Sequence, residues 1–241
     1  ACCSLRLLPY RWMADAPQLP ASLALRPSRA IDAIADFIAD PVVAVQFPEH
    51  HLRFRNDRAA REVALDTLSE TAWVAHFGRF DPLPGSLPQP LALRYHGHQF
   101  RAYNPEIGDG RGFLFAQLHD YAGRLMDLGT KGSGQTPYSR FGDGRLTLKG
   151  AVREILATEM LEALGVPTSR TFSVIETGEA LHRGDEPSPT RSAVLVRLNH
   201  GHIRIGSFQR LATLGDTASL ARLVAYSLHQ YFGEPLGDGR G

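Results

Sequence analysis

The segment Gly108-Asp109-Gly110-Arg111-Gly112 contains residue types that could bind an anion. Glycine lacks a Cβ atom, so the backbone amides around Gly108 and Gly110 can approach an anion closely, and Arg111 adds a positive charge. The Gly-Asp-Gly pattern is equally typical of an ordinary hairpin turn. The segment therefore indicates a phosphate site only if other cationic residues join it.

Lys131 has the second suitable setting, because Gly132–Gly134 follow it directly. A lysine at the end of a strand beside a glycine-rich loop can reach phosphate oxygens as a point charge. Glu154 lies on the clearest helical pattern of the chain, and protein kinases fix their phosphate-binding lysine with a glutamate from the following helix. In the alternative, Glu154 is a surface residue that pairs with Arg153 or Lys149.

Two further segments carry residues suited to phosphate. Asp143 and Gly144 precede the same helix, whose N-terminal amides favour an anion, although Asp143 could equally be the cap of that helix. Arg197 and Arg204 bracket a strand end and a turn, and arginine side chains suit bidentate contacts to phosphate. Together with Lys131, these residues predict a site for a phosphorylated ligand.

Histidine pairs occur twice, at His96 with His98 and at His200 with His202. A His-x-His pair without a third ligand is more often structural than metal-binding, and the only two cysteines are adjacent near the start of the chain. We therefore predict no metal ligands in this chain. The sequence has no Walker-type Gly-Lys-Ser/Thr loop, no Gly-x-Ser-x-Gly elbow and no dinucleotide fingerprint.

Apolar periodicity predicts the elements that must position these residues. We expect helices over 31–38, within 57–77, over 146–164 and over 220–232, and strands over 42–47, 112–118, 125–131, 171–176 and 192–198. Residues 120–124 should form the turn of a hairpin between the strands 112–118 and 125–131. The expected packed face of helix 146–164 is formed by Leu148, Val152, Ile155, Leu156 and Met160. This order of elements is typical of an α+β fold.

Composition indicates a globular protein with an ordinary core, since 43% of its 241 residues are hydrophobic and 21% are charged. The net charge of +1 gives no global case for binding nucleic acid or an anionic membrane. No apolar run reaches the roughly 20 residues that span a bilayer. We expect a cytoplasmic protein with a disordered lead-in over 1–28, an N-terminal extension over 29–88 and a nucleotide-binding lobe over 89–241.

Five motifs in this order resemble the selenoprotein O family, a group of pseudokinase-like enzymes that transfer AMP rather than phosphate. The motifs are PLALRYHGHQF (90–100), IGDGRGF (107–113), LGTKGSGQTPYSRFGDGRLTLKGAVRE (128–154), TSRTFSVIETGEAL (168–181) and LVRLNHGHIRIGSFQRL (195–211). With a looser match over 54–85, the resemblance covers about three quarters of the chain. It implies a protein-kinase-like fold, mainly the N-lobe, in which an antiparallel sheet packs against an equivalent of the C-helix.

The resemblance also implies roles for single residues. Lys131 would contact the nucleotide with Glu154 as its supporting ion-pair partner, and Arg197 and Arg204 would hold phosphates. The other residues that would contact the nucleotide are Gly108, Gly110, Arg111, Asp143 and Gly144. ATP would lie inverted relative to a kinase, so that AMP passes to a Ser, Thr or Tyr hydroxyl of a protein substrate and pyrophosphate leaves.

The family's catalytic aspartate and its metal ligands match no segment of this sequence, so we expect them, with Mg²⁺ or Mn²⁺, beyond residue 241. We therefore expect the chain to be catalytically incomplete by itself. An alternative hypothesis is an inactive pseudokinase module that binds ATP or ADP. A third hypothesis is an ordinary kinase, which would transfer the γ-phosphoryl group instead.

Overall fold

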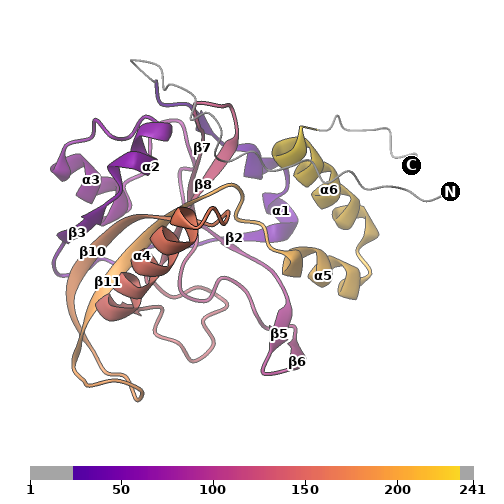
Figure 1. The fold of residues 1–241 in the computed structure, drawn as a ribbon. Helices are drawn as coiled ribbons and strands as arrows, with labels where there is room; N and C mark the ends of the chain where they lie inside the picture. Colours follow the sequence, from indigo (N-terminus) through magenta and orange to yellow (C-terminus); the bar gives the residue numbers. More distant parts are fainter. Residues whose placement is uncertain (1–23, 234–241) are drawn as a thin grey trace.

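The computed structural model describes residues 24–233, and its centre is a large antiparallel sheet (Figure 1). Within this range the sheet follows the order β2-β4-β7-β8-β11-β10-β3, with β1 paired to β7 and β9 paired to β11. Its strands are β1 (Pro27–Ser28), β2 (Ala39–Pro41), β3 (His51–Arg55), β4 (Leu91–Leu93), β7 (Leu114–His119), β8 (Leu125–Lys131), β9 (Leu146–Thr147), β10 (Arg170–Leu181) and β11 (Thr190–Asn199). A separate hairpin joins β5 (Gly97–Gln99) and β6 (Ala102–Asn104). The combination of helices with an antiparallel sheet that is expected of an α+β fold is thus present.

Helices cover both faces and one end of this sheet. They are η1 (Ala30–Ala33), α1 (Ala35–Ile38), α2 (Asp57–Glu62), α3 (Glu70–Phe77), α4 (Leu148–Ala163), α5 (Ile205–Leu214), α6 (Thr217–Ser227) and η2 (Leu228–Phe232). Figure 1 shows α4 lying across β10 and β11, while α5 and α6 lie beside α1 at the opposite end. Among residues 24–233, no helix combines the length and the apolarity that a membrane crossing requires.

The hairpin of β7 and β8 is confirmed, and β8 has the predicted bounds. Its turn is stabilised by Asp120, whose Oδ1 accepts hydrogen bonds from the backbone N–H groups of Ala122 and Arg124 at 2.9 Å. Gly123 takes a positive φ of 82° in this turn. Local side-chain-to-backbone bonding of this kind is readable from sequence because it spans only a few residues.

Helix α4 forms where it was predicted, but only two of the five residues of its predicted packed face, Leu148 and Ile155, pack against the sheet. Val152, Leu156 and Met160 are 43%, 66% and 58% exposed, whereas Ala151 and Thr158 are buried against the sheet. Thr158 Oγ1 lies 3.0 Å from Thr171 Oγ1 on β10. Leu148 and Ile155 of the predicted face do pack against the apolar cluster beneath the helix, but the buried positions are the small residues Ala151 and Thr158, which let the helix approach the strands closely.

Two other expectations are corrected, and one helix was missed. Residues 42–47 form no strand; Val42 N–H donates to Pro90 O at the end of the β2–β4 pairing, and Val45 N–H donates to Ser133 O. The helical pattern of 57–77 is divided into α2 and α3, with Ala64 at a φ of 59° between them. Helix α5 was not predicted at all.

The segment 29–88 shares the sheet and the main core with the rest of the chain. It contributes β2 and β3, and its α3 places Trp73 against Phe172 of β10 with ring centroids 4.9 Å apart. The indole N–H of Trp73 donates to Ser173 Oγ at 2.9 Å. Residues 1–23 of the expected lead-in lie outside the described residues, and Pro27–Ser28 form β1.

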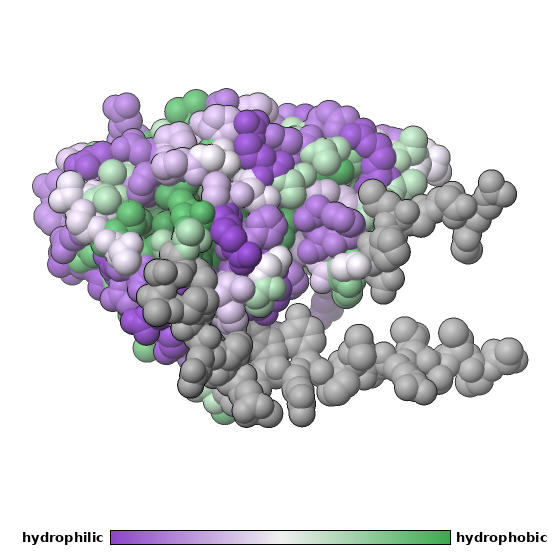
Figure 2. Space-filling model, turned by 90° about the horizontal axis from the view of Figure 1, so that it is seen from above, coloured by the Kyte–Doolittle hydropathy of each residue, from purple (hydrophilic) through white to green (hydrophobic). Residues whose placement is uncertain are grey.

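The surface is mixed in character. Figure 2, which views the molecule from above, shows hydrophilic residues interspersed with smaller hydrophobic areas. Such a distribution is ordinary for the surface of a folded domain. The described core includes the fully buried Trp73, Phe77, Phe113 and Phe172.

Candidate nucleotide-binding site

Strand register places Lys131 and Arg197 on one face of the sheet. Lys131 of β8 pairs with Leu195 of β11, and Leu195 belongs to the apolar cluster beneath α4. Because alternate residues of a strand share a face, Arg197 lies on the same side as Leu195. The carboxylate of Glu154 on α4 forms ion pairs with both Lys131 and Arg197.

Burial and neighbouring cations make the Lys131 ammonium unusually acidic. Desolvation, followed by the positive charges of Arg197, Arg111 and Arg204, lowers the pKa of Lys131 to about 8. An anion bound here would offset the repulsion among the four cations.

Arg197 carries an unsatisfied donor in the same place. Its Nε atom is buried and has no hydrogen-bond partner among the described residues, while its NH2 group contacts Glu154. Burial and the charges of Arg204 and Arg111 lower the pKa of Arg197 from its ordinary value. Buried donors in folded proteins are nearly always satisfied, so an orphaned N–H fits a site that receives an acceptor from a ligand or from water.

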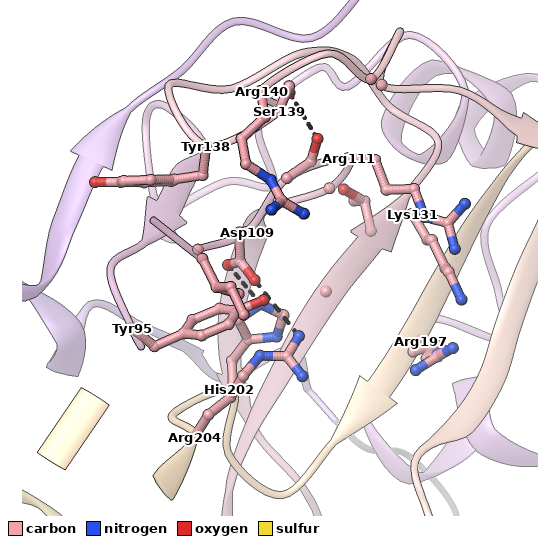
Figure 3. Close-up of a pocket in the computed structure, with 18 of the residues that line it drawn as sticks. Tyr95, Asp109, Arg111, Lys131, Tyr138, Ser139, Arg140, Arg197, His202 and Arg204 are labelled. Atoms are coloured by element: carbon pink, nitrogen blue, oxygen red, sulfur yellow. Dashed lines mark hydrogen bonds and ion pairs between the residues drawn. The ribbon is translucent and has the colours of Figure 1, made fainter. Parts of the chain in front are cut away.

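These side chains line a cavity of about 910 Å³, here named the cationic cavity (Figure 3). It brings together every residue for which a nucleotide contact was predicted, namely Gly108, Gly110, Arg111, Lys131, Asp143, Gly144, Arg197 and Arg204. Glu154 lines a neighbouring cavity of about 640 Å³, which shares Arg111 and Lys131 with the first. Residues from segments nearly 100 positions apart therefore converge on one space.

The loop before β7 is held mainly through its carbonyl oxygens. Thr136 Oγ1 donates to the carbonyl of Asp109, Ser139 Oγ donates to that of Gly110 at 2.6 Å, and Gly132 N–H donates to that of Arg111 at 2.6 Å. The segment that follows β8 thus clamps the loop at three successive residues.

Gly108 and Gly144 are required by close packing with protein groups. A Cβ atom on Gly108 would overlap the ring of Tyr138, whose hydroxyl donates to Asp40 of β2. Gly144 has a φ of 70° and lies against the backbone of Gly134. Anion approach, the reason suggested by the sequence, is therefore not the only constraint that selects glycine here.

Asp143 is not the cap of α4, contrary to one of the two sequence interpretations. Thr147 occupies that position, and its side chain accepts the N–H of Gly150. Asp143 Oδ1 instead accepts the N–H of Arg145 at 2.9 Å, and its other oxygen forms an ion pair with Arg183 at 2.8 Å. It lies on the rim of the cationic cavity.

Several residues of the cavity were not recognised from the sequence. Among them are Tyr95, Asp109, Tyr138, Phe141 and His202. His202 was interpreted as structural, and Asp109 was passed over inside the glycine-rich segment, although a carboxylate flanked by glycines and followed by arginine was a usable signal. Tyr95 and Tyr138 lie within the family motifs, but only the fold brings their side chains to the cavity. Within residues 24–233, no group of three or more His, Cys, Asp or Glu side chains is arranged to hold a metal ion.

Comparison with known proteins supplies the family. The family profile described as "Protein adenylyltransferase SelO" matches residues 22–239. The "Protein nucleotidyltransferase YdiU" of Synechococcus elongatus is 52% identical over 211 residues, which cover 87% of this chain and 42% of that protein. The proteins of the same name from Gloeobacter violaceus and Aeromonas salmonicida are 55% and 39% identical, over 84% and 81% of this chain. The chain thus spans 40–42% of the length of these three relatives.

Proposed function

Because the chain belongs to the SelO family of protein adenylyltransferases, we propose that it binds ATP in the cationic cavity and is the ATP-binding half of an enzyme that adenylylates proteins. The observation that carries this proposal is the convergence of Arg111, Lys131, Arg197 and Arg204 on one cavity, with the buried Nε of Arg197 left without a partner among the described residues. Such a set of donors suits the triphosphate of a nucleotide.

The reaction that we propose transfers AMP to the hydroxyl of a Ser, Thr or Tyr side chain on a protein substrate. The hydroxyl oxygen bonds to the α-phosphorus of ATP, the bond from that phosphorus to the bridging oxygen breaks, and pyrophosphate leaves. The hydroxyl proton passes to a base, which we expect outside this chain. Lys131 and the three arginines would stabilise the negative charge that develops on the phosphate oxygens.

Magnesium or manganese is expected with ATP, and a divalent ion would neutralise phosphate charge. The described residues do not supply an obvious ligand set for it. The chain's own contribution is therefore taken to be electrostatic and positional: Lys131 and Arg197 are fixed by Glu154, and the loop around Gly110 is clamped by Ser139.

We further propose that this arrangement corresponds to the small lobe of a protein kinase. The support is the antiparallel β7-β8-β11-β10 sheet, the helix α4 across it, and the ion pair between a strand lysine and a helix glutamate. In kinases that pair positions the lysine on ATP phosphates. Here Glu154 also holds Arg197, a second cation from the same face.

The first test is ATP binding by the chain itself, measured calorimetrically. Lys131→Ala should weaken ATP binding by about tenfold or more, since it removes a charged phosphate contact. It also leaves Glu154 with Arg197 as its remaining ion-pair partner among the described residues. The matched control is Lys149→Ala, because the other lysine of the chain is exposed and pairs with Glu186. Saturable binding that is indifferent to Lys131→Ala would contradict the proposed site.

The reaction is tested with the full-length protein that contains this chain. Incubation with ATP labelled at the α-phosphorus should label protein, whereas γ-labelled ATP should not. Transfer of the γ-label would identify a kinase. Binding of ATP without transfer of either label would favour an inactive ATP- or ADP-binding module.

A further inference from the structure

A buried carboxylate lies inside the cationic cavity, where a negative charge should repel a phosphate ligand. Asp109 is only 5% exposed, and its Oδ2 accepts the N–H of Leu93 at 3.0 Å and lies 3.2 Å from His202 Nε2. Its Oδ1 accepts a hydrogen bond from Arg204 NH2 at 3.4 Å. Burial opposes ionisation, but His202, Arg204 and the amide of Leu93 outweigh it and lower the pKa of Asp109. The carboxylate is therefore charged at neutral pH.

Arg204 contacts this carboxylate and one aromatic ring. Its guanidinium carbon lies 5.0 Å from the ring centroid of Tyr95, a cation-π arrangement, while its side chain is 53% exposed. Figure 3 shows Asp109, Tyr95 and His202 grouped around the Arg204 guanidinium, across the cavity from Lys131. Contacts to Asp109 and Tyr95 restrict an otherwise flexible side chain and leave the rest of the guanidinium available to the cavity.

The turn that carries Arg204 is anchored at His202 as well. The N–H of His202 donates to Asp127 Oδ2 at 2.6 Å, and its ring packs on Gly129, where a Cβ atom would lie 2.6 Å from the ring. The Nε2 atom of the same ring contacts Asp109 Oδ2. The Asp109 carboxylate therefore contacts two side chains of this turn, the imidazole of His202 and the guanidinium of Arg204.

We propose that Asp109 is a positioning residue for nucleotide binding, which holds Arg204 over Tyr95 and directs its guanidinium toward the phosphates. The inference rests on the proposed function, since it concerns the same ATP site. A repulsive charge is tolerated at this position because fixing Arg204 before ATP binds removes part of the entropy cost of ordering a long side chain. Asp109 itself contacts no phosphate.

The sign of one mutational effect tests this inference. Asp109→Asn keeps the size of the side chain and an acceptor for Leu93, but it removes the negative charge. Simple Coulomb attraction then predicts tighter ATP binding, whereas loss of positioning predicts binding weaker by about fivefold. In the Arg204→Ala background, Asp109→Asn should no longer weaken binding. Equal or tighter binding by the single variant would overturn the proposal.

A second readout does not depend on ATP. The Nε–H resonance of Arg204, assigned by its loss in Arg204→Ala, should be resolved in the free wild-type protein and broadened or averaged in Asp109→Asn. If that variant does not fold, Tyr95→Leu removes the other support of the guanidinium and should broaden the same resonance and weaken ATP binding. An unchanged resonance in the folded variants would overturn positioning by these contacts.

The outcomes separate this inference from the proposed function. Absence of saturable ATP binding in the wild-type chain would refute both. Wild-type binding that is weakened by Lys131→Ala but not by Asp109→Asn would retain the nucleotide site and reject the role of Asp109. Binding that both variants weaken, with the Asp109 effect abolished in Arg204→Ala, is the result that we expect.

Discussion

The surroundings of Lys131 change the pKa of its ammonium group. The ammonium is partly buried near Arg197, Arg111 and Arg204, and its pKa is lowered to about 8. The arginines keep their charge over the accessible pH range, so Lys131 is the cation of this group whose charge changes near neutrality. A lysine in this state is charged below about pH 8 and increasingly neutral above it.

ATP affinity should therefore depend on pH. A bound polyphosphate favours the charged lysine and raises its pKa, so affinity should be greatest below about pH 7.5 and fall as the pH rises from about 8 to 9.5. The fall cannot exceed about tenfold per pH unit for one proton. Calorimetric titrations across this range measure it. Lys131→Arg, which stays charged, is the control, and a pH dependence equal to that of the wild type would assign the effect to another group.

At the scale of elements, two large apolar side chains on helices, Trp73 and Leu156, differ in how much they contribute to the stability of the fold. Trp73 on α3 is fully buried, stacks on Phe172 and packs edge-on against Phe77 with centroids 4.6 Å apart. Leu156 on α4 is 66% exposed although it lies in the predicted apolar stripe. Burial rather than residue type should decide the effect of removing each side chain.

Trp73→Ala should lower the free energy of unfolding by about 3–5 kcal/mol, because it leaves a large cavity and removes the hydrogen bond that the indole N–H donates to Ser173 Oγ. Leu156→Ala should change it by no more than about 0.5 kcal/mol. Urea denaturation followed by circular dichroism measures both. A large loss for Leu156→Ala would mean that this face of α4 is covered in the folded protein.

At the scale of the whole molecule, the segment 29–88 and the remainder share one sheet. Strand β3 pairs with β10, β2 pairs with β4, and one apolar cluster contains Val42 and Trp73 together with Leu128. A boundary near residue 88 would cut through this cluster.

The chain should therefore unfold in a single cooperative transition. Calorimetric and van't Hoff enthalpies should agree, and tryptophan fluorescence should report the same midpoint as the far-ultraviolet signal. Two resolved transitions, one lost on truncation of residues 1–88, would show instead that the extension folds independently.

Sequence alone predicted eight of the residues that line the cationic cavity and the elements that carry Lys131 and Glu154, but it missed other lining residues such as Tyr95 and His202. The hairpin of β7 and β8 and the helix α4 were predictable because turn chemistry and apolar periodicity act within a few residues. The resemblance of the motifs to the family supplied the other predicted nucleotide contacts, among them Gly108, Arg197 and Arg204. The comparison supports that family, whereas the role of each residue stays a prediction.

Only the tertiary structure decided which groups meet. Tyr138 packs on Gly108 and bonds Asp40, which is 98 residues away, and Asp109 reaches Arg204 across 95 residues. The packed side of α4 was chosen by close approach of Ala151 to the sheet. Such choices depend on the volume and charge of partners distant in sequence, and no local pattern encodes which partner a side chain will meet.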